Sequence, residues 1–129
     1  MSAFNPFLPF AHLALRMRKP IFHIAIKAAF RRDSKTYQPE SIVSNGFIHC
    51  AEAHQIMDVA NRKFFGREDA ILLRIDPERV TAELRYENLS GGGEIFPHIY
   101  GALNSDAITA VEPLRIADMG AFEPPTCLK

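Results

Sequence analysis

The sequence has few cysteines, no net charge and no long apolar run, and each shortage argues against a class of protein. Two cysteines, Cys50 and Cys127, are too few for a disulfide framework, so we expect reduced thiols in a cytoplasmic protein. Fifteen basic and fifteen acidic residues cancel, which removes the general attraction that favours a nucleic-acid partner. No stretch approaches the roughly 18 consecutive apolar residues of a membrane span. We therefore expect neither a nucleic-acid nor a membrane partner.

Familiar nucleotide-binding and hydrolase motifs are also missing. The sequence has no Gly-x-x-x-x-Gly-Lys phosphate loop, no Gly-x-Gly-x-x-Gly after a strand, no Gly-x-Ser-x-Gly elbow and no His-Glu-x-x-His. Three glycines at 91–93 follow no strand-to-helix pattern, so we interpret them as a plain loop. Any site in this chain must therefore be found from less familiar patterns.

The chain length of 129 residues fits one domain. Residues 1–19 are interpreted as an N-terminal extension. Their apolar part contains prolines and precedes the basic residues, an order that is wrong for a secretory signal. Residues 20–116 are predicted to form the single domain, and residues 117–129, which contain two adjacent prolines, a C-terminal tail.

Short apolar runs predict more strands than long helices. Helices are expected over 27–32, 39–44 and 54–65, the last having an apolar face and a glycine at its end. Strands are expected over 21–26, 47–51, 70–75, 82–86 and 107–111. Because the strands do not alternate cleanly with helices, the pattern predicts an α+β fold with a mainly antiparallel sheet.

Three apolar segments each contain one histidine: His23, His49 and His98. The segment from Gly46 to Ala51 contains His49, and we interpret it as the stretch around which the chain is organised. A lone histidine in an apolar strand is more often a hydrogen-bonded core residue than a functional one. Three in similar contexts favour one shared cleft, because a buried imidazole is costly unless its ring nitrogens are bonded. Both interpretations, core and cleft, stay open.

Neither a metal site nor a cysteine nucleophile is favoured by the spacing. A three-histidine site is a known zinc arrangement, but these histidines include no closely spaced pair, so we expect no metal. Cys50 follows His49 directly, and neighbouring side chains in a strand point to opposite faces. Cys50 is therefore predicted to be a small core residue, as free cysteines often are.

Other candidate residues lie around the glycine loop and the third histidine. His98 and Tyr100 are two residues apart and share a strand face, where they either contact a ligand or form an aromatic cluster at a sheet edge. Glu87 and Glu94 flank the glycine loop. Each is either a solvated carboxylate or the acid that binds a ribose hydroxyl.

Several of these segments together resemble the bacterial domain-of-unknown-function family 952. The resemblance covers about residues 21–114. The sequence departs from the family at Ala51, where Ser or Thr is usual and would also cap the next helix, and at Phe30, where Trp is common. The matching segments are Ile21-Phe22-His23-Ile24-Ala25, Gly46-Phe47-Ile48-His49-Cys50, Ala60-Asn61-Arg62, Phe96-Pro97-His98-Ile99-Tyr100-Gly101 and Leu103-Asn104.

That family resembles the ADP-ribosyltransferase fold, nearest its tRNA 2′-phosphotransferase branch. The resemblance implies split antiparallel sheets that hold NAD or an ADP-ribose nucleotide in a cleft. It places His23 and His49 beside the dinucleotide as catalytic and binding residues, with Glu87 and Glu94 as candidate catalytic carboxylates. His98, Tyr100, Asn61 and Arg62 would complete the cofactor-binding site.

The function implied is binding of such a nucleotide, with ADP-ribosyl transfer or NAD cleavage as the reaction if the site is catalytic. Fold analogy does not establish reaction. Two alternatives therefore stay open: a non-catalytic binding or interaction module that kept the pocket, and a histidine-based metal hydrolase.

Overall fold

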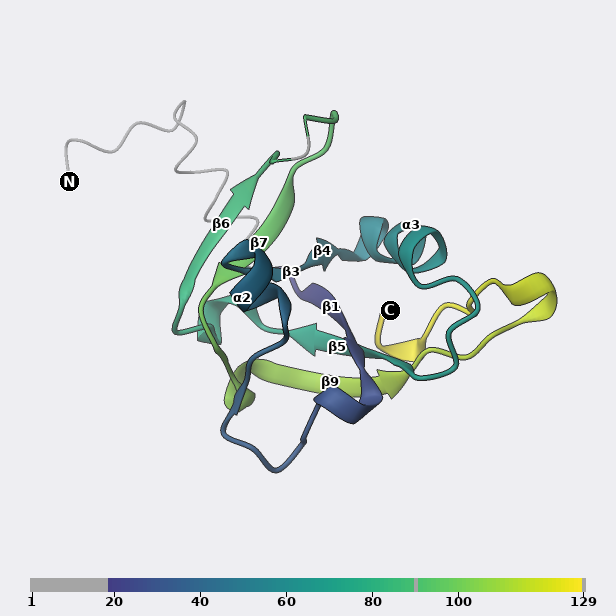
Figure 1. The fold of residues 1–129 in the computed structure, drawn as a ribbon, viewed down its shortest axis with the longest axis horizontal. Coiled ribbons are helices and arrows are strands. Elements are labelled where there is room, and N and C mark those ends of the chain that lie inside the picture. Colours follow the sequence, from purple (N-terminus) through teal and green to yellow (C-terminus); the bar gives the residue numbers. More distant parts are fainter. Residues whose placement is uncertain (1–18, 90, 129) are drawn as a thin grey trace.

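The structure is a computed structural model that describes residues 19–89 and 91–128, and Figure 1 shows its arrangement. Most of the predicted N-terminal extension lies outside the described residues. The helices are α2 (Ser41–Asn45) and α3 (Ala53–Lys63), with short 3-10 turns at Lys27–Ala29, Pro77–Arg79, Ser105–Ala107, Asp118–Gly120 and Thr126–Leu128. The strands are β1 (Ile21–Ile26), β2 (Thr36–Tyr37), β3 (Ile48–His49), β4 (Ala51–Glu52), β5 (Ala70–Ile75), β6 (Glu83–Glu87), β7 (Phe96–Tyr100), β8 (Leu103–Asn104) and β9 (Ile108–Pro113).

The strands form two main sheets and one small ribbon. The larger sheet has the order β4-β1-β5-β9, the second has the order β3-β7-β6, and β2 pairs with β8. All of these pairings are antiparallel, so the predicted α+β class with a mainly antiparallel arrangement is confirmed. In Figure 1, β6 and β7 stand steeply while β5 and β9 run across the lower part of the molecule.

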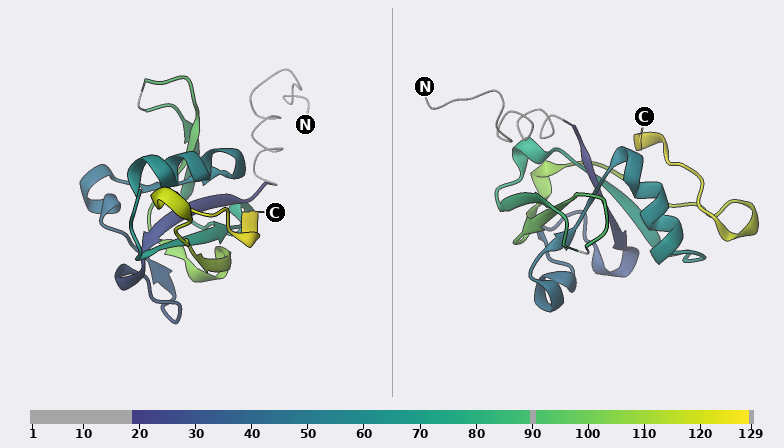
Figure 2. Two further views of the ribbon diagram at one scale, coloured as in Figure 1. Left: turned by 90° about the vertical axis from the view of Figure 1, so that its right-hand side faces the viewer. Right: turned by 90° about the horizontal axis from the view of Figure 1, so that it is seen from above.

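Strand β1 separates the two apolar cores. Ile21 and Ala25 pack into a core that also contains side chains of the second sheet, such as Ile48 and Ile99. Phe22 and Ile24 pack into the other core, under α3, with Ile56, Ala60 and Leu72. Side chains alternate between the two faces of this strand, which places His23 on the face of Ile21 and Ala25. Figure 2 shows α3 lying across the larger sheet.

The predicted single strand over 47–51 is wrong. Ile48 and His49 pair with β7 in the second sheet, whereas Ala51 and Glu52 pair with β1 in the larger one. The chain changes sheets at Cys50, whose N–H donates to the carbonyl oxygen of Pro97 at 3.1 Å. Cys50 itself is buried in the core between the sheets, as predicted.

The helices differ from their predicted ranges mainly at the ends. Helix α2 ends at Gly46, whose φ of +87° is the left-handed conformation that favours glycine at this position. Helix α3 begins with a capping box between Glu52 and Gln55, so the residue that caps it is Glu52 and not the residue at position 51. The predicted helix over 27–32 is only a short 3-10 turn. Within the described part of the chain, no helix is both long and apolar enough to span a membrane.

Candidate functional site

Two adjoining pockets form one cleft. Their volumes are about 350 Å³ and about 460 Å³, and both are lined by His49, Cys50, Val59 and Lys63. We call the smaller pocket the first lobe and the larger one the second lobe. The first lobe is also lined by His23, Ile24, Tyr37, Glu40, Ser41 and Ile56. The second is also lined by Asn45, Phe47, Arg62, Leu89, Phe96 and His98.

His23 links the two sheets beside the first lobe. Its Nδ1 lies 2.6 Å from the carbonyl oxygen of His49, and its Nε2 lies 2.8 Å from the hydroxyl of Tyr37. Because a carbonyl only accepts, Nδ1 carries the proton, and the Tyr37 hydroxyl therefore donates to Nε2. Burial lowers the pKa of His23 to about 4, so the ring is neutral near pH 7. Burial also raises the pKa of Tyr37.

The first lobe offers two hydroxyl groups on otherwise mostly apolar walls. Within the described part of the chain, the hydroxyl of Ser41 is buried without a hydrogen-bond partner. The Tyr37 oxygen donates its proton to His23 and keeps its lone pairs as acceptors. An unsatisfied buried hydroxyl costs free energy that a ligand could recover. The lobe therefore suits a flat ring with polar atoms at one edge, and Glu40 and Lys63 are the charged side chains in its lining.

The second lobe contains two facing histidines. The ring centroids of His49 and His98 are 6.0 Å apart, and the Phe47 ring lies 4.7 Å from the first and 4.3 Å from the second. His49 donates from Nε2 to the side-chain oxygen of Asn45 at 3.2 Å. Partial burial of the ring lowers the pKa of His49, and the charges of Lys63 and His98 lower it further.

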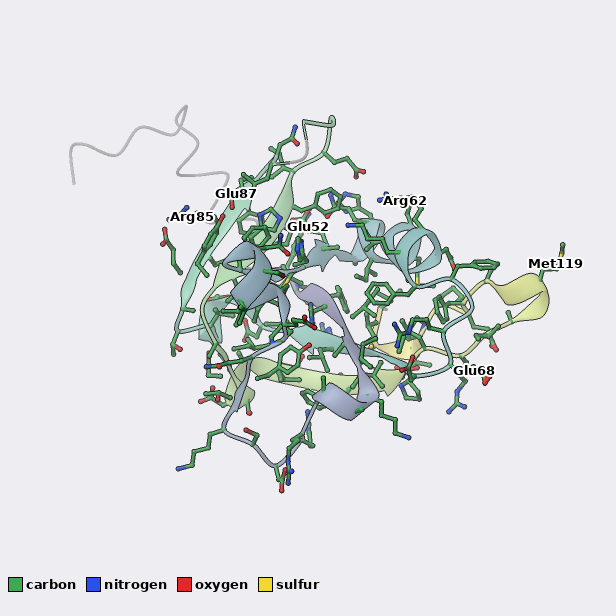
Figure 3. The ribbon with its side chains drawn as sticks, in the orientation of Figure 1. Glu52, Arg62, Glu68, Arg85, Glu87 and Met119 are labelled. Carbon is green, nitrogen blue, oxygen red and sulfur yellow. The ribbon has the colours of Figure 1, made fainter. Side chains whose placement is uncertain are left out.

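Glu87 fixes the His98 ring through a hydrogen bond. Nδ1 of His98 lies 3.0 Å from a carboxylate oxygen of Glu87, and the hydroxyl of Tyr100 donates to the same oxygen. The bond from Tyr100, followed by that from His98, lowers the pKa of Glu87, so this carboxylate is ionised near pH 7. The guanidinium of Arg85 lies over the Tyr100 ring, 4.2 Å from its centroid. Figure 3 shows Arg85 and Glu87 on β6, and Arg62 on α3.

The last turn of α3 brings positive charge to the second lobe. Lys63 lines both lobes, and among the described residues it has no ion-pair partner. Arg62 lines the second lobe and pairs with Asp58 at 2.9 Å on the exposed side of the helix. Together with the neutral His49, these two cations make the second lobe suitable for an anionic group such as a phosphate.

The predicted site residues fall into three groups. His23, His49, His98 and Arg62 line the cleft. Tyr100 and Glu87 line neither lobe but support His98. The remaining two lie elsewhere: Glu94 is exposed and accepts from Gln55 at 3.3 Å, and the side-chain oxygen of Asn61 accepts from the N–H of Phe122 at 2.9 Å, which ties the C-terminal tail to α3.

Sequence reasoning missed Tyr37, Glu40, Ser41 and Lys63. The first three lie between predicted elements or in the first turn of a short helix, where the sequence pattern does not show which side chains meet at a cleft. Lys63 has the position of an ordinary basic residue in the last turn of a helix, which is common for reasons of helix stability alone.

The geometry also bears on a metal site. Among the described residues, no group of three histidine, cysteine or acidic side chains is placed to hold a metal ion. Both ring nitrogens of His23 already form hydrogen bonds, so this residue could ligate a metal only by losing one of them.

Comparison with known proteins identifies a family and a fold relative. No curated protein matches the sequence. The crystal structure of protein CC0527 from Caulobacter crescentus is similar, with a TM-score of 0.75, 25% sequence identity, and coverage of 85% of this chain and 98% of that one. The solution NMR structure of CC0527 gives a TM-score of 0.68, 26% identity, and coverage of 79% and 90%. Residues 24–111 match the family described as protein of unknown function, DUF952, and the chain belongs to that family.

Proposed function

We propose that the cleft binds NAD or a related ADP-ribose nucleotide, with an uncharged aromatic ring in the first lobe and phosphate in the second. The observation that carries this proposal is the meeting of two unlike lobes at His49. The first is mostly apolar and has two hydroxyl-bearing residues, and the second adds Arg62 to the Lys63 that both lobes share. Both lie in the size range of small-molecule sites.

The first lobe suits the carboxamide or amine edge of a nucleotide ring. The Tyr37 oxygen can accept from the N–H of such a group, and the Ser41 hydroxyl, which is buried and has no partner among the described residues, could bond to it by turning towards the lobe. The aliphatic side chains of Ile24, Ile56 and Val59 would cover the faces of the ring. His23 then acts as a fixed, neutral support for Tyr37.

The arrangement of the sheets supports the same ligand class. The resemblance to ADP-ribosyltransferases implies a nucleotide between two splayed antiparallel sheets, and the cleft here lies where β1 and β3 meet. That support is an analogy of fold and says nothing about the reaction.

Binding without transfer is the form that the geometry favours. Of the two predicted catalytic carboxylates, Glu94 is exposed outside the cleft and Glu87 is bonded to His98 and Tyr100. ADP-ribosyl transfer or NAD cleavage is the second candidate, and one observation favours it: Glu40 lines the first lobe. A carboxylate there could stabilise positive charge that develops on a ribose ring.

Calorimetry with NAD, ADP-ribose and nicotinamide tests the proposal. We expect Lys63→Met to weaken binding of NAD and ADP-ribose by about tenfold, because one charged hydrogen bond is lost. Arg62 lines only the second lobe, so Arg62→Met should weaken binding of NAD and ADP-ribose in the same way and leave binding of nicotinamide unchanged. Lys35→Met, at an exposed lysine that lines neither lobe, is the matched control. The proposal fails if the parent protein binds none of the three ligands. Release of nicotinamide from NAD would support the transferase candidate over a simple binder.

A further inference from the structure

His49 and His98 each have one ring nitrogen committed and one left over. Nε2 of His49 donates to Asn45, which leaves Nδ1 with the lone pair of a neutral imidazole. Nδ1 of His98 bonds to Glu87, and within the described part of the chain Nε2 has no hydrogen-bond partner. His23 differs, because both of its nitrogens are bonded. The second lobe therefore has two imidazoles able to exchange protons with a ligand.

The two uncommitted nitrogens differ in what stands behind them. His98 has the ionised carboxylate of Glu87 at 3.0 Å, so a proton on Nε2 completes an imidazolium–carboxylate ion pair. His49 has an uncharged amide as its partner, and partial burial, followed by the charge of Lys63, lowers its pKa. This asymmetry places an acid at His98 and a base at His49.

The remaining lining of the second lobe fits a nucleoside phosphate. Arg62 and Lys63 provide positive charge for non-bridging phosphate oxygens. Leu89 and Phe96 provide an apolar wall on which a base could lie, and Leu89 is 58% exposed, as an unoccupied contact surface would be.

We propose that the second lobe is a metal-independent active site that hydrolyses a nucleoside 2′,3′-cyclic phosphodiester. This goes beyond nucleotide binding, because it assigns a reaction and a substrate class to His49 and His98. Binding alone would not need an acid and a base at these positions. A cyclic phosphodiester fits because its leaving oxygen is a ribose hydroxyl, which needs a proton, and its attacking water must lose one. The two histidines meet these two needs.

The step balances with water as the only co-reactant. The water oxygen attacks phosphorus while Nδ1 of His49 takes its proton. The bond from phosphorus to one ribose oxygen breaks, and Nε2–H of protonated His98 gives its proton to that oxygen. The product is a nucleoside phosphomonoester. His49 then loses a proton to solvent and His98 gains one, which restores the starting state.

Glu87 is a positioning residue in this scheme. It touches no reacting atom, but it fixes the orientation of His98 and gives its ring a carboxylate partner. Tyr100 donates to the same carboxylate and thereby holds Glu87 in place. Glu87 and Tyr100 therefore both act on the position of the His98 ring.

Hydrolysis of adenosine 2′,3′-cyclic phosphate by the full chain tests the proposal, with bis(4-nitrophenyl) phosphate as a second substrate. Nitrophenolate leaves without a proton, so only the cyclic phosphate needs the acid. We expect His49→Asn to lower kcat/KM for both substrates by about 100-fold or more. We expect His98→Asn and Glu87→Gln to lower it for the cyclic phosphate far more than for the nitrophenyl ester. His54→Asn, at an exposed histidine of α3, is the matched control and should leave both rates unchanged.

The two-substrate design separates chemistry from folding. A variant that only unfolds loses both activities together, whereas loss of the acid affects one. Equal losses on both substrates in folded His98→Asn and Glu87→Gln, checked by circular dichroism, would overturn the acid assignment. Absence of hydrolysis in the parent protein, or the same rate in the parent and His49→Asn, would overturn the proposal.

The outcome is independent of the nucleotide-binding proposal. Hydrolysis of the cyclic phosphate without binding of NAD or ADP-ribose would support the proposed hydrolase site and contradict the nucleotide-binding proposal. Binding of NAD or ADP-ribose without hydrolysis would do the reverse.

Discussion

His23 and the pair formed by His49 and His98 use the same side chain in opposite ways. His23 is buried, neutral and bonded through both ring nitrogens to groups of its own protein. His49 and His98 line the second lobe, and among the described residues each has one ring nitrogen without a hydrogen-bond partner. All three lie in apolar segments of the sequence. The difference shows that the number of committed ring nitrogens, rather than the apolar context, separates a structural histidine from one available to a ligand.

The largest expected effect concerns pH. The pKa of His23 is about 4 in the folded protein and about 6.5 in the unfolded chain, so between these values only the unfolded chain binds the proton. The contribution to stability is therefore fully present above pH 6.5 and is lost as the pH falls towards 4, in total by about 3 kcal/mol. The lowered pKa of His49 acts in the same direction.

Urea unfolding of the parent and His23→Gln at several pH values between 7 and 4 measures this contribution. Subtraction removes the effect of carboxylates common to both proteins. Identical pH profiles for the two proteins would mean that His23 is not the buried neutral ring described above.

A smaller effect is expected when the ring is removed at pH 7. His23→Ala leaves the Tyr37 hydroxyl and the His49 carbonyl without their partner, which should cost about 1–3 kcal/mol of unfolding free energy. His49→Ala should cost less than about 0.5 kcal/mol, because that side chain is exposed. Urea unfolding at pH 7, with His54→Ala as control, compares the three. Equal costs for His23→Ala and His49→Ala would contradict the view that His23 is a structural residue and His49 is not.

Removal of a single hydroxyl sharpens the comparison further. Tyr37→Phe takes away the donor to Nε2 of His23 and should cost about 1 kcal/mol. A double-mutant cycle with His23→Gln isolates the bond between the two side chains, and a coupling energy near zero would argue against it.

The smallest effect is expected at Asn45, the hydrogen-bond partner of His49. The bond from His49 to Asn45 is 3.2 Å long and exposed, so Asn45→Ala should change the unfolding free energy by no more than about 0.5 kcal/mol. The same unfolding assay checks this. A cost comparable with that of Tyr37→Phe would show that the hydrogen bond of His49 to Asn45 contributes as much to stability as the bond of His23 to Tyr37.

The elements that follow a clear period could be predicted from the sequence. The short apolar run over 21–26 predicted β1 with its bounds, and the apolar spacing in α3 predicted that helix to within a few residues. The organising role of the segment around His49 is also consistent with the structure, because this segment lines both lobes.

The change of sheet at Cys50 could not be predicted. The run from Phe47 to Ala51 contains no turn residue, and alternation reports which face a side chain occupies but not which strand the backbone joins. Asn61 shows the same limit for side chains. It belongs to a segment shared with a family, and yet its amide oxygen bonds the backbone of Phe122, a partner that local sequence cannot reveal.

The change of sheet at Cys50 has a mechanical consequence. Over three consecutive residues the backbone is bonded first to His23 through the His49 carbonyl, then to Pro97 through the Cys50 N–H, and then to β1 at Ala51. These bonds connect the two sheets through one segment, so we expect the sheets to unfold together there. Amide hydrogens here should exchange with deuterium only as fast as the whole domain unfolds. We therefore expect a ligand to enter the cleft as it stands, without separation of the two sheets at this segment.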